Sequence, residues 1–333
     1  EVFDSKEMIA DITKNIILPS ISNFEKQAIL LEKQALAFAQ NPTEESLVTA
    51  QEQWKNTAVS YANIYAFNIG VPKKKFMHHL LYNWPVFVND FNKATASDNK
   101  INIDKISTRS KGLTGLEYLL FVSNDISNKK IVDLFIANPK RVSYLITVAK
   151  DLKKQALKLS EIWNGQQENY QEVFINNAET GLKSSLNMLC NGLFNVVGTV
   201  KKAKLGKPAG LQGSSSTNYD LLQAYRSEIS LQLIRNNIAS VQKVYFNTSG
   251  SGIADNVRFI SKNNNINDKI RNQFANIDKA IDQIHMPLRL AIDQQKKPIE
   301  KLFKEITELV WLLNNDVRST LSIIVTPTDN DGD

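Results

Sequence analysis

Apolar residues recur at steps of three and four along most of the chain, the spacing of a helix with one buried face. The clearest examples begin near Asn41 and just after Pro139. Asn41 suits a helix cap, Pro42 the first helical position, and Glu44 the acidic partner of a capping box. Pro19 is expected to kink or break the first helical stretch. Further amphipathic stretches cover residues 6–38, 170–200, 219–244, 266–292 and 299–321.

The alternation of polar and apolar residues that marks β-strands is missing, because the run at 322–326 is short and terminal. Three polar or glycine-containing segments interrupt the helices and are typical of loops, at residues 94–109, 205–218 and 247–252. The pattern therefore predicts an all-α protein.

A length of 333 residues suggests two domains. A polar Asn-Gly-Gln-Gln stretch near residue 165 divides the chain into halves of about four helices each. The prediction is two packed helical bundles, residues 1–165 and 166–325, followed by a disordered acidic tail at 326–333. Acidic residues alternate in this tail as at the start of a calcium loop, but no glutamate follows to complete such a loop.

Composition narrows the class of protein. Hydrophobic residues make up 42% and charged residues 22%, as in a folded globular chain. The net charge of +6 comes from short, separate lysine groups without interleaved aromatics, which does not fit a nucleic-acid-binding surface. The single cysteine, Cys190, stands in an apolar run and is expected to be a small buried residue. No apolar run is long enough to span a membrane, and the first residues are not those of a signal peptide, which fits a cytoplasmic protein or one already processed.

Standard catalytic motifs are lacking. His78 and His79 are neighbours, so on a regular helix they point about 100° apart and cannot hold one metal together. The zinc-protease pairing of histidines four residues apart does not occur, and neither does the G-x-S-x-G motif of serine hydrolases. The sequence thus argues against peptidase activity and against an enzyme in general.

The segment 112–121 is the most informative, because Glu117 stands there among apolar residues after two glycines. It is expected in the first turn of a helix. Burying a carboxylate costs several kcal/mol unless it is paired or hydrogen-bonded. Glu117 is therefore either a structural cap or pair, or part of a ligand site.

The spacing of Gly112, Thr114 and Glu117 resembles the G-x-H-x-x-E motif of the imelysin-like proteins, a bacterial family associated with iron acquisition. The resemblance implies two domains like four-helix bundles, with the motif near their interface. It also implies export to the periplasm or outer membrane, often as a lipoprotein whose lipid anchor would be the only membrane contact. Similar segments follow in the family's order: Asn41-Pro42-Thr43 with Trp54, Leu81-Tyr82-Asn83-Trp84-Pro85, Lys204-Leu205-Gly206-Lys207-Pro208-Ala209-Gly210, and Leu222-Gln223-Ala224-Tyr225-Arg226-Ser227.

Two positions depart from the family pattern. Thr114 replaces the motif's histidine, and Gln223 replaces a glutamate found in some members. A hydroxyl and a neutral amide are poor ligands for iron or zinc, so this chain should bind such metals weakly or not at all. Glu117 and Arg226 are then expected to form a charge-assisted pair, which either holds the domains together or contacts a polar ligand.

The resulting hypothesis is an envelope-located binding protein for iron acquisition, with a polar site near the interface of two helical bundles. Its expected partners are a metal, haem or a small polar ligand, together with envelope proteins, and its cofactor would be iron or another divalent metal. The alternatives are a metal-dependent peptidase and a non-catalytic structural or interaction lipoprotein. The expected ligand-binding residues are Gly112, Thr114, Glu117, Trp84, Gln223 and Arg226, with Glu117 as the metal ligand.

Overall fold

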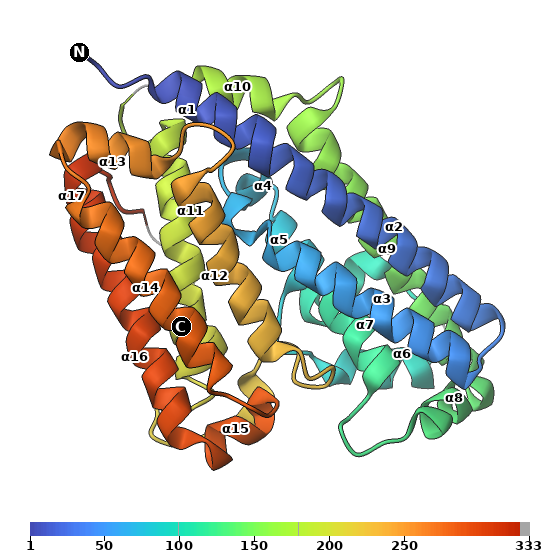
Figure 1. Ribbon diagram of the computed structural model, residues 1–333. Coiled ribbons are helices and arrows are strands. Elements are labelled where there is room, and N and C mark those ends of the chain that lie inside the picture. Colours follow the sequence, from blue (N-terminus) through green and yellow to red (C-terminus); the bar gives the residue numbers. More distant parts are fainter. Residues whose placement is uncertain (99, 179, 327–333) are drawn as a thin grey trace.

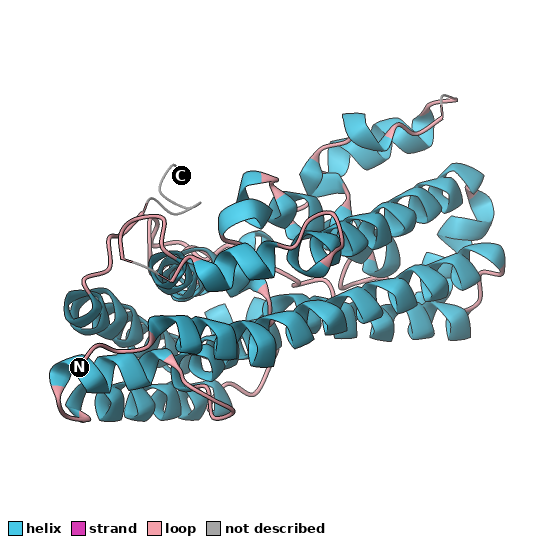
Figure 2. Ribbon diagram, turned by 90° about the horizontal axis from the view of Figure 1, so that it is seen from above, coloured by secondary structure: helices cyan, strands magenta, loops and turns pink. Residues whose placement is uncertain are grey.

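The computed structural model describes residues 1–98, 100–178 and 180–326, and this part of the chain contains helices, turns and loops but no strand (Figure 2). The expected all-α class is confirmed. The helices are α1 (Ser5–Ile12), α2 (Leu18–Gln40), α3 (Glu44–Ala62), α4 (Gly70–Lys74), α5 (Met77–Tyr82), α6 (Val88–Ala96), α7 (Gly112–Phe121), α8 (Asn128–Ala137), α9 (Pro139–Asn164), α10 (Tyr170–Asn176), α11 (Ser185–Thr199), α12 (Ser230–Phe246), α13 (Ile253–Ser261), α14 (Asn265–Asp282), α15 (Leu288–Gln294), α16 (Lys296–Leu312) and α17 (Arg318–Leu321).

Two groups of long helices lie side by side (Figure 1). In the first, α2 packs on α3 and α9, and α7 packs on the same two helices. In the second, α11 packs on α12 and α16, and α14 packs on α12 and α16. The groups meet where α12 contacts α3 and where α11 contacts the 3-10 turn Tyr65–Phe67. One cluster of buried apolar side chains extends through both groups.

The first helix, α1, belongs by its contacts to the second group. It lies beside α10 and α11 (Figure 1). The carboxylate of Asp11 accepts a hydrogen bond from Ser251 N at 2.8 Å, and Asn15 Nδ2 donates to Ser249 O at 3.2 Å. The division into residues 1–165 and 166–325 stays a prediction, and these contacts show that the amino-terminal helix crosses it.

The start of α3 differs from the expectation. Thr43, rather than Asn41, is the cap, since its hydroxyl accepts from Ser46 N at 3.1 Å while Ser46 Oγ accepts from Thr43 N at 3.1 Å. Ser46 therefore closes the capping box in place of Glu44. At Pro139 the expectation is confirmed, because that proline is the first residue of α9. Pro19 is the second residue of α2, and the α-helical pattern of this stretch is interrupted before it by the π-helical turn Thr13–Ile17, through which the backbone stays helical.

Three of the expected long helices are interrupted. The stretch at 170–200 breaks between α10 and α11, where Ser184 caps the second helix, and the stretch at 266–292 breaks before Pro287. Residues 222–229 are not helical, because Ala224 (φ 60°) and Glu228 (φ 61°) both adopt the left-handed conformation that breaks a helix. This last break forms one wall of the site described below.

The described residues include no helix that is both long enough and apolar enough to cross a membrane. Cys190 is buried, as expected. Thr326, the first residue of the expected acidic tail, donates its backbone N–H to Asn191 Oδ1 at 3.0 Å. The rest of that tail, residues 327–333, lies outside the described residues.

Candidate functional site

Helix α7 is fixed by contacts along its whole length. Gly112 opens it with φ 61°, and a Cβ there would lie 2.6 Å from Leu81 O, so only glycine fits. Two side chains of α3 bond its backbone, Trp54 Nε1 to Leu113 O and Gln51 Nε2 to Leu120 O, both at 2.9 Å. Because α7 begins at Gly112, the motif glutamate lies in its second turn rather than in the expected first.

Glu117 is buried, with 6% of its surface exposed. Its Oε2 accepts two hydrogen bonds from Ser227, from the backbone N–H at 3.1 Å and from the hydroxyl at 2.5 Å. Burial raises the pKa of this carboxyl, while the two Ser227 bonds and the nearby Arg226 charge act in the opposite direction. The glutamate of the first helix group is thus held by the non-helical segment that precedes α12.

Arg226 does not form the pair with Glu117 that the sequence suggested. Its Nε donates to Val122 O at 2.8 Å, and its guanidinium lies over the rings of Tyr225 at 4.5 Å and Tyr118 at 5.2 Å. The tight turn around residues 224–228 directs Ser227 toward the carboxylate and leaves the arginine among the aromatic rings. Arg226 therefore joins the two helix groups at the end of α7 and acts on Glu117 only through its charge.

An internal cavity lies next to this junction, between α3, α5 and α12. It encloses about 10 Å³, which is room for about one water molecule. The groups that line it come from both halves of the chain. They are Ala58, Tyr61, Ala62, Tyr65, His78, Tyr82, Trp84, Lys204, Gln223, Leu233 and Asn237.

Lys204 is a buried cation in the wall of this cavity, with 5% of its surface exposed. Its Nζ donates to Asn237 Oδ1 at 2.5 Å and lies 5.4 Å from the Trp84 ring and 5.7 Å from the Tyr65 ring. Burial lowers its pKa to about 7. Amide and aromatic groups stabilise this ammonium only partly, so an anion close to it would be strongly attracted.

His78 is buried beside the same cavity, and its Nδ1 lies 2.6 Å from the Tyr61 hydroxyl. Burial lowers its pKa to about 3, and the charges of His79 and Lys204 add to that effect. The imidazole is therefore neutral near pH 7.

Replacing His78 with glutamine is expected to change how stability depends on pH. The unfolded histidine binds a proton below about pH 6.5, whereas the folded one stays neutral down to about pH 3. The unfolded state thus binds more protons in this window, and the wild type loses stability as the pH falls through it. The variant lacks this loss, so the difference in unfolding free energy between the two proteins should shift by about 2 kcal/mol in the variant's favour from pH 7 to pH 5. Urea unfolding at both pH values measures this shift, and a constant difference would contradict a buried neutral histidine.

Three buried polar atoms have no hydrogen-bond partner among the described residues: Tyr82 OH and Gln223 Oε1 in the wall of this cavity, and Thr114 Oγ1 on α7. Burial and the charge of Glu117 raise the pKa of Tyr82. Two of the three groups, Thr114 and Gln223, are the positions where the chain departs from the family motif. Unsatisfied buried groups of this kind mark places where water or a ligand supplies the missing bonds.

A wider cleft shares Trp84 with this cavity. Its volume is about 400 Å³, within the range of small-molecule sites. Tyr65, His78 and Trp84 line both spaces and so stand between the cleft and the cavity. The remaining residues of the cleft are His79, Asn83, Pro85, Arg109, Ala203, Lys207 and Leu221.

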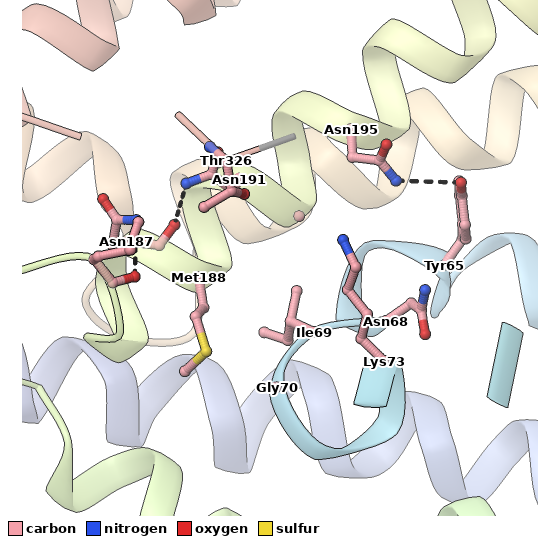
Figure 3. A pocket seen from close by; sticks show the side chains of 12 residues that line it. Tyr65, Asn68, Ile69, Gly70, Lys73, Asn187, Met188, Asn191, Asn195 and Thr326 are labelled. Carbon is pink, nitrogen blue, oxygen red and sulfur yellow. Dashed lines mark hydrogen bonds between the residues drawn. The ribbon is translucent and has the colours of Figure 1, made fainter. Parts of the chain in front are cut away.

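Another pocket, of about 80 Å³, lies between α4 and α11 (Figure 3). Two asparagines one helical turn apart on α11 hold the chain near its carboxyl end there. Asn187 bonds Ile324 through both backbone groups, at 2.8 and 3.0 Å, and Asn191 bonds Ile324 O and Thr326 N. Asn195, one turn further along, donates to Tyr65 OH at 3.2 Å. These contacts hold Ile324 and Thr326 against α11.

The donor set does not fit a resident transition metal. No group of three or more His, Cys, Asp or Glu side chains within the described ranges could hold a metal ion. Thr114 supplies a hydroxyl on the same helix as Glu117, and the carboxylate is already bonded by Ser227. The expectation that losing the motif histidine weakens metal binding stays a prediction.

The six residues expected from sequence fall in three places. Trp84 and Gln223 line the internal cavity. Gly112, Thr114 and Glu117 lie together on buried α7, and Arg226 lies at its end. Sequence reasoning missed His78, Lys204 and Arg109. Lys204 begins a family-like segment and His78 was considered as a metal ligand, but nothing in the sequence showed that they are buried.

The fold and the junction around α7 define an all-α protein of two packed helix groups with a buried polar site between them. A family model described as Imelysin matches residues 17–313. The chain belongs to the imelysin family.

Solved structures agree with this family. An imelysin-like protein from Psychrobacter arcticum 273-4 superposes with a TM-score of 0.78 at 19% identity, covering 98% of this chain and 99% of its own. A protein from Parabacteroides distasonis ATCC 8503, named "putative iron-regulated protein A precursor", gives a TM-score of 0.79 at 18% identity, covering 95% of this chain and 94% of its own. No curated protein matches the sequence.

Proposed function

We propose that this imelysin-family protein is an envelope-located binding protein that takes part in iron acquisition. Its ligand would lie in the cleft in front of Trp84, where residues of both halves of the chain meet. The observation that carries the proposal is this shared cleft, next to a buried polar cavity that the same tryptophan also lines. The neighbour named for iron regulation supports the link to iron, and the word precursor in its name supports export.

A peptidase is less well supported by the geometry. Hydrolysis needs a base with access to water and a group that stabilises the oxyanion. Glu117 is buried and its Oε2 already accepts two bonds from Ser227. A purely structural role for the Glu117–Ser227 contact is compatible with ligand binding, since that contact positions the segment 222–229 beside the cavity.

Deleting the gene in its native host is expected to lower cell-associated iron under iron limitation, because the proposed carrier is lost. The measurement is total cell iron by mass spectrometry, with fractionation of the full-length product to locate it. Complementation with wild type should restore the iron level, and complementation with Lys207→Gln should not. Unchanged iron in the deletion strain, or a product found only in the cytoplasm, would refute the proposal.

Binding measurements on the purified protein show whether it binds haem or ferrous ion. Absorption titration with haem and calorimetry with ferrous ion examine the two ligands named by the hypothesis. Because the chain lacks the motif histidine and its described residues form no metal-ligand cluster, free ferrous ion is expected to bind weakly at most. Cleavage of an unstructured protein that stops with a chelator and in Glu117→Ala would favour the peptidase instead.

A further inference from the structure

The charged side chains that line the cleft are all basic. Arg109 and Lys207 line it, and no aspartate or glutamate lines it among the residues that the structure describes. Arg109 comes from the 3-10 turn Thr108–Ser110, and Lys207 comes from the other half of the chain, just after the π-helical turn Val200–Gly206. The two cations therefore reach the cleft from separate elements, and a ligand between them meets positive charge on two sides.

The Arg109 side chain is held so that its two terminal guanidinium nitrogens can contact a ligand. Its Nε donates to Pro85 O at 2.5 Å, which ties the side chain to the Trp84-Pro85 segment. The terminal nitrogens can then contact a planar carboxylate, the group whose geometry an arginine fork matches. Asn83 is also tied, with Nδ2 donating to Thr108 Oγ1 at 2.8 Å, so this wall of the cleft is ordered before any ligand arrives.

A third basic side chain, Lys204, lies next to Trp84. Lys204 Nζ lies 5.4 Å from the Trp84 ring, on the side of the internal cavity. It is buried, and among the described residues it has no carboxylate partner; its hydrogen bond goes to Asn237. When Lys204 is protonated, which its pKa of about 7 favours below neutral pH, its field adds to that of Arg109 and Lys207, because low-dielectric walls concentrate the potential inside a cleft.

From these contacts we infer that the cleft recognises a small polycarboxylate anion, with one carboxylate at Arg109 and another at Lys207. Iron then binds here as a chelate of such an anion rather than as a bare ion. The part that concerns iron rests on the proposed function. Two separated cations suit two anionic groups on one molecule better than a single phosphate, and the volume of about 400 Å³ accommodates a molecule of this size. The lack of a metal-ligand cluster among the described residues explains why the chelator, not the metal, would be recognised.

Calorimetry with citrate, iron(III) citrate, inorganic phosphate and ferrous ion alone tests this inference on the purified chain. Citrate and iron(III) citrate are expected to bind at one site, and phosphate and ferrous ion at least tenfold more weakly. Arg109→Gln and Lys207→Gln should each weaken citrate binding by tenfold or more. Lys74→Gln removes the same charge from an exposed position outside the cleft and should leave binding unchanged. Circular dichroism and melting of each variant show that it is folded.

The inference is overturned if neither form of citrate binds, if phosphate binds as tightly as citrate, or if Lys207→Gln binds citrate like wild type. Binding of free citrate but not of iron(III) citrate would leave the anion site in place and remove its role in iron binding. Loss of cell iron in the deletion strain without any citrate binding would do the reverse, keeping the proposed function and rejecting the polycarboxylate.

Discussion

Replacing Glu117 with alanine is expected to lower the free energy of unfolding by about 2–5 kcal/mol. The Ser227 N–H would then be buried without its acceptor, which costs about 1–3 kcal/mol, and the missing side-chain atoms leave a cavity that costs about 1–2 kcal/mol more. Glu117→Gln keeps the volume and one acceptor while removing a charge that burial disfavours, so it should change stability by less than about 1 kcal/mol. Urea unfolding of both variants at pH 7 measures the contrast.

Two further variants show whether the loss of stability comes from the contact between Glu117 and Ser227. Ser227→Ala removes the hydroxyl bond and keeps the backbone bond, so a loss of about 1.5–3 kcal/mol is expected for a bond to a charged group. Glu308→Ala changes an exposed glutamate of α16 and should stay within about 0.5 kcal/mol of wild type. Equal stability of Glu117→Ala and wild type would show that the carboxylate does not join the two halves.

Replacing Lys204 with methionine is expected to stabilise the protein by about 2 kcal/mol at pH 6. The lysine pKa falls from 10.5 to about 7 on folding, which corresponds to roughly 5 kcal/mol of unfavourable free energy where both states are protonated. In the variant, Asn237 Oδ1 loses its donor, which offsets about 1–3 kcal/mol of the stabilisation. The lost contacts with the Trp84 and Tyr65 rings offset about 1 kcal/mol more.

The gain should depend on pH in a definite direction. Between about pH 7 and pH 10.5 the unfolded lysine holds a proton that the folded lysine releases, so wild-type stability from this group rises with pH. The advantage of Lys204→Met should therefore shrink above pH 7 and disappear by about pH 9. Lys269→Met, at an exposed position of α14, should show neither the gain nor the pH dependence. A destabilised Lys204→Met at pH 6 would mean that the ammonium is well satisfied in the folded protein.

Much of the fold could be predicted from the sequence, because amphipathic periodicity and helix starts are local features. The all-α class and the start of α9 at Pro139 followed from them. The break at residues 222–229 could not be predicted, since Ala224 and Glu228 adopt positive φ without being glycine. Their conformation depends on packing against α7, which no local pattern encodes.

The candidate site was predicted only in part, because local sequence shows which group needs a partner but not which partner it finds. Glu117 stood out because a carboxylate among apolar residues needs a partner, and the structure shows it buried and bonded. The partner was expected to be Arg226 and is Ser227, because the direction of neighbouring side chains follows from the turn around them. Lys204 was quoted within a family-like segment, but its burial arises from α12 and Trp84, which lie far away in sequence.

The measurement that tests the central claim most directly is an iron-edge anomalous difference map from crystals grown with iron(III) citrate. We predict one iron peak in the cleft between Trp84, Arg109 and Lys207, with citrate density reaching both cations. A peak beside Glu117 and Thr114 would show that the protein binds bare metal at the motif. Iron at neither position in crystals of the folded protein would contradict the proposal that this cleft holds the ligand.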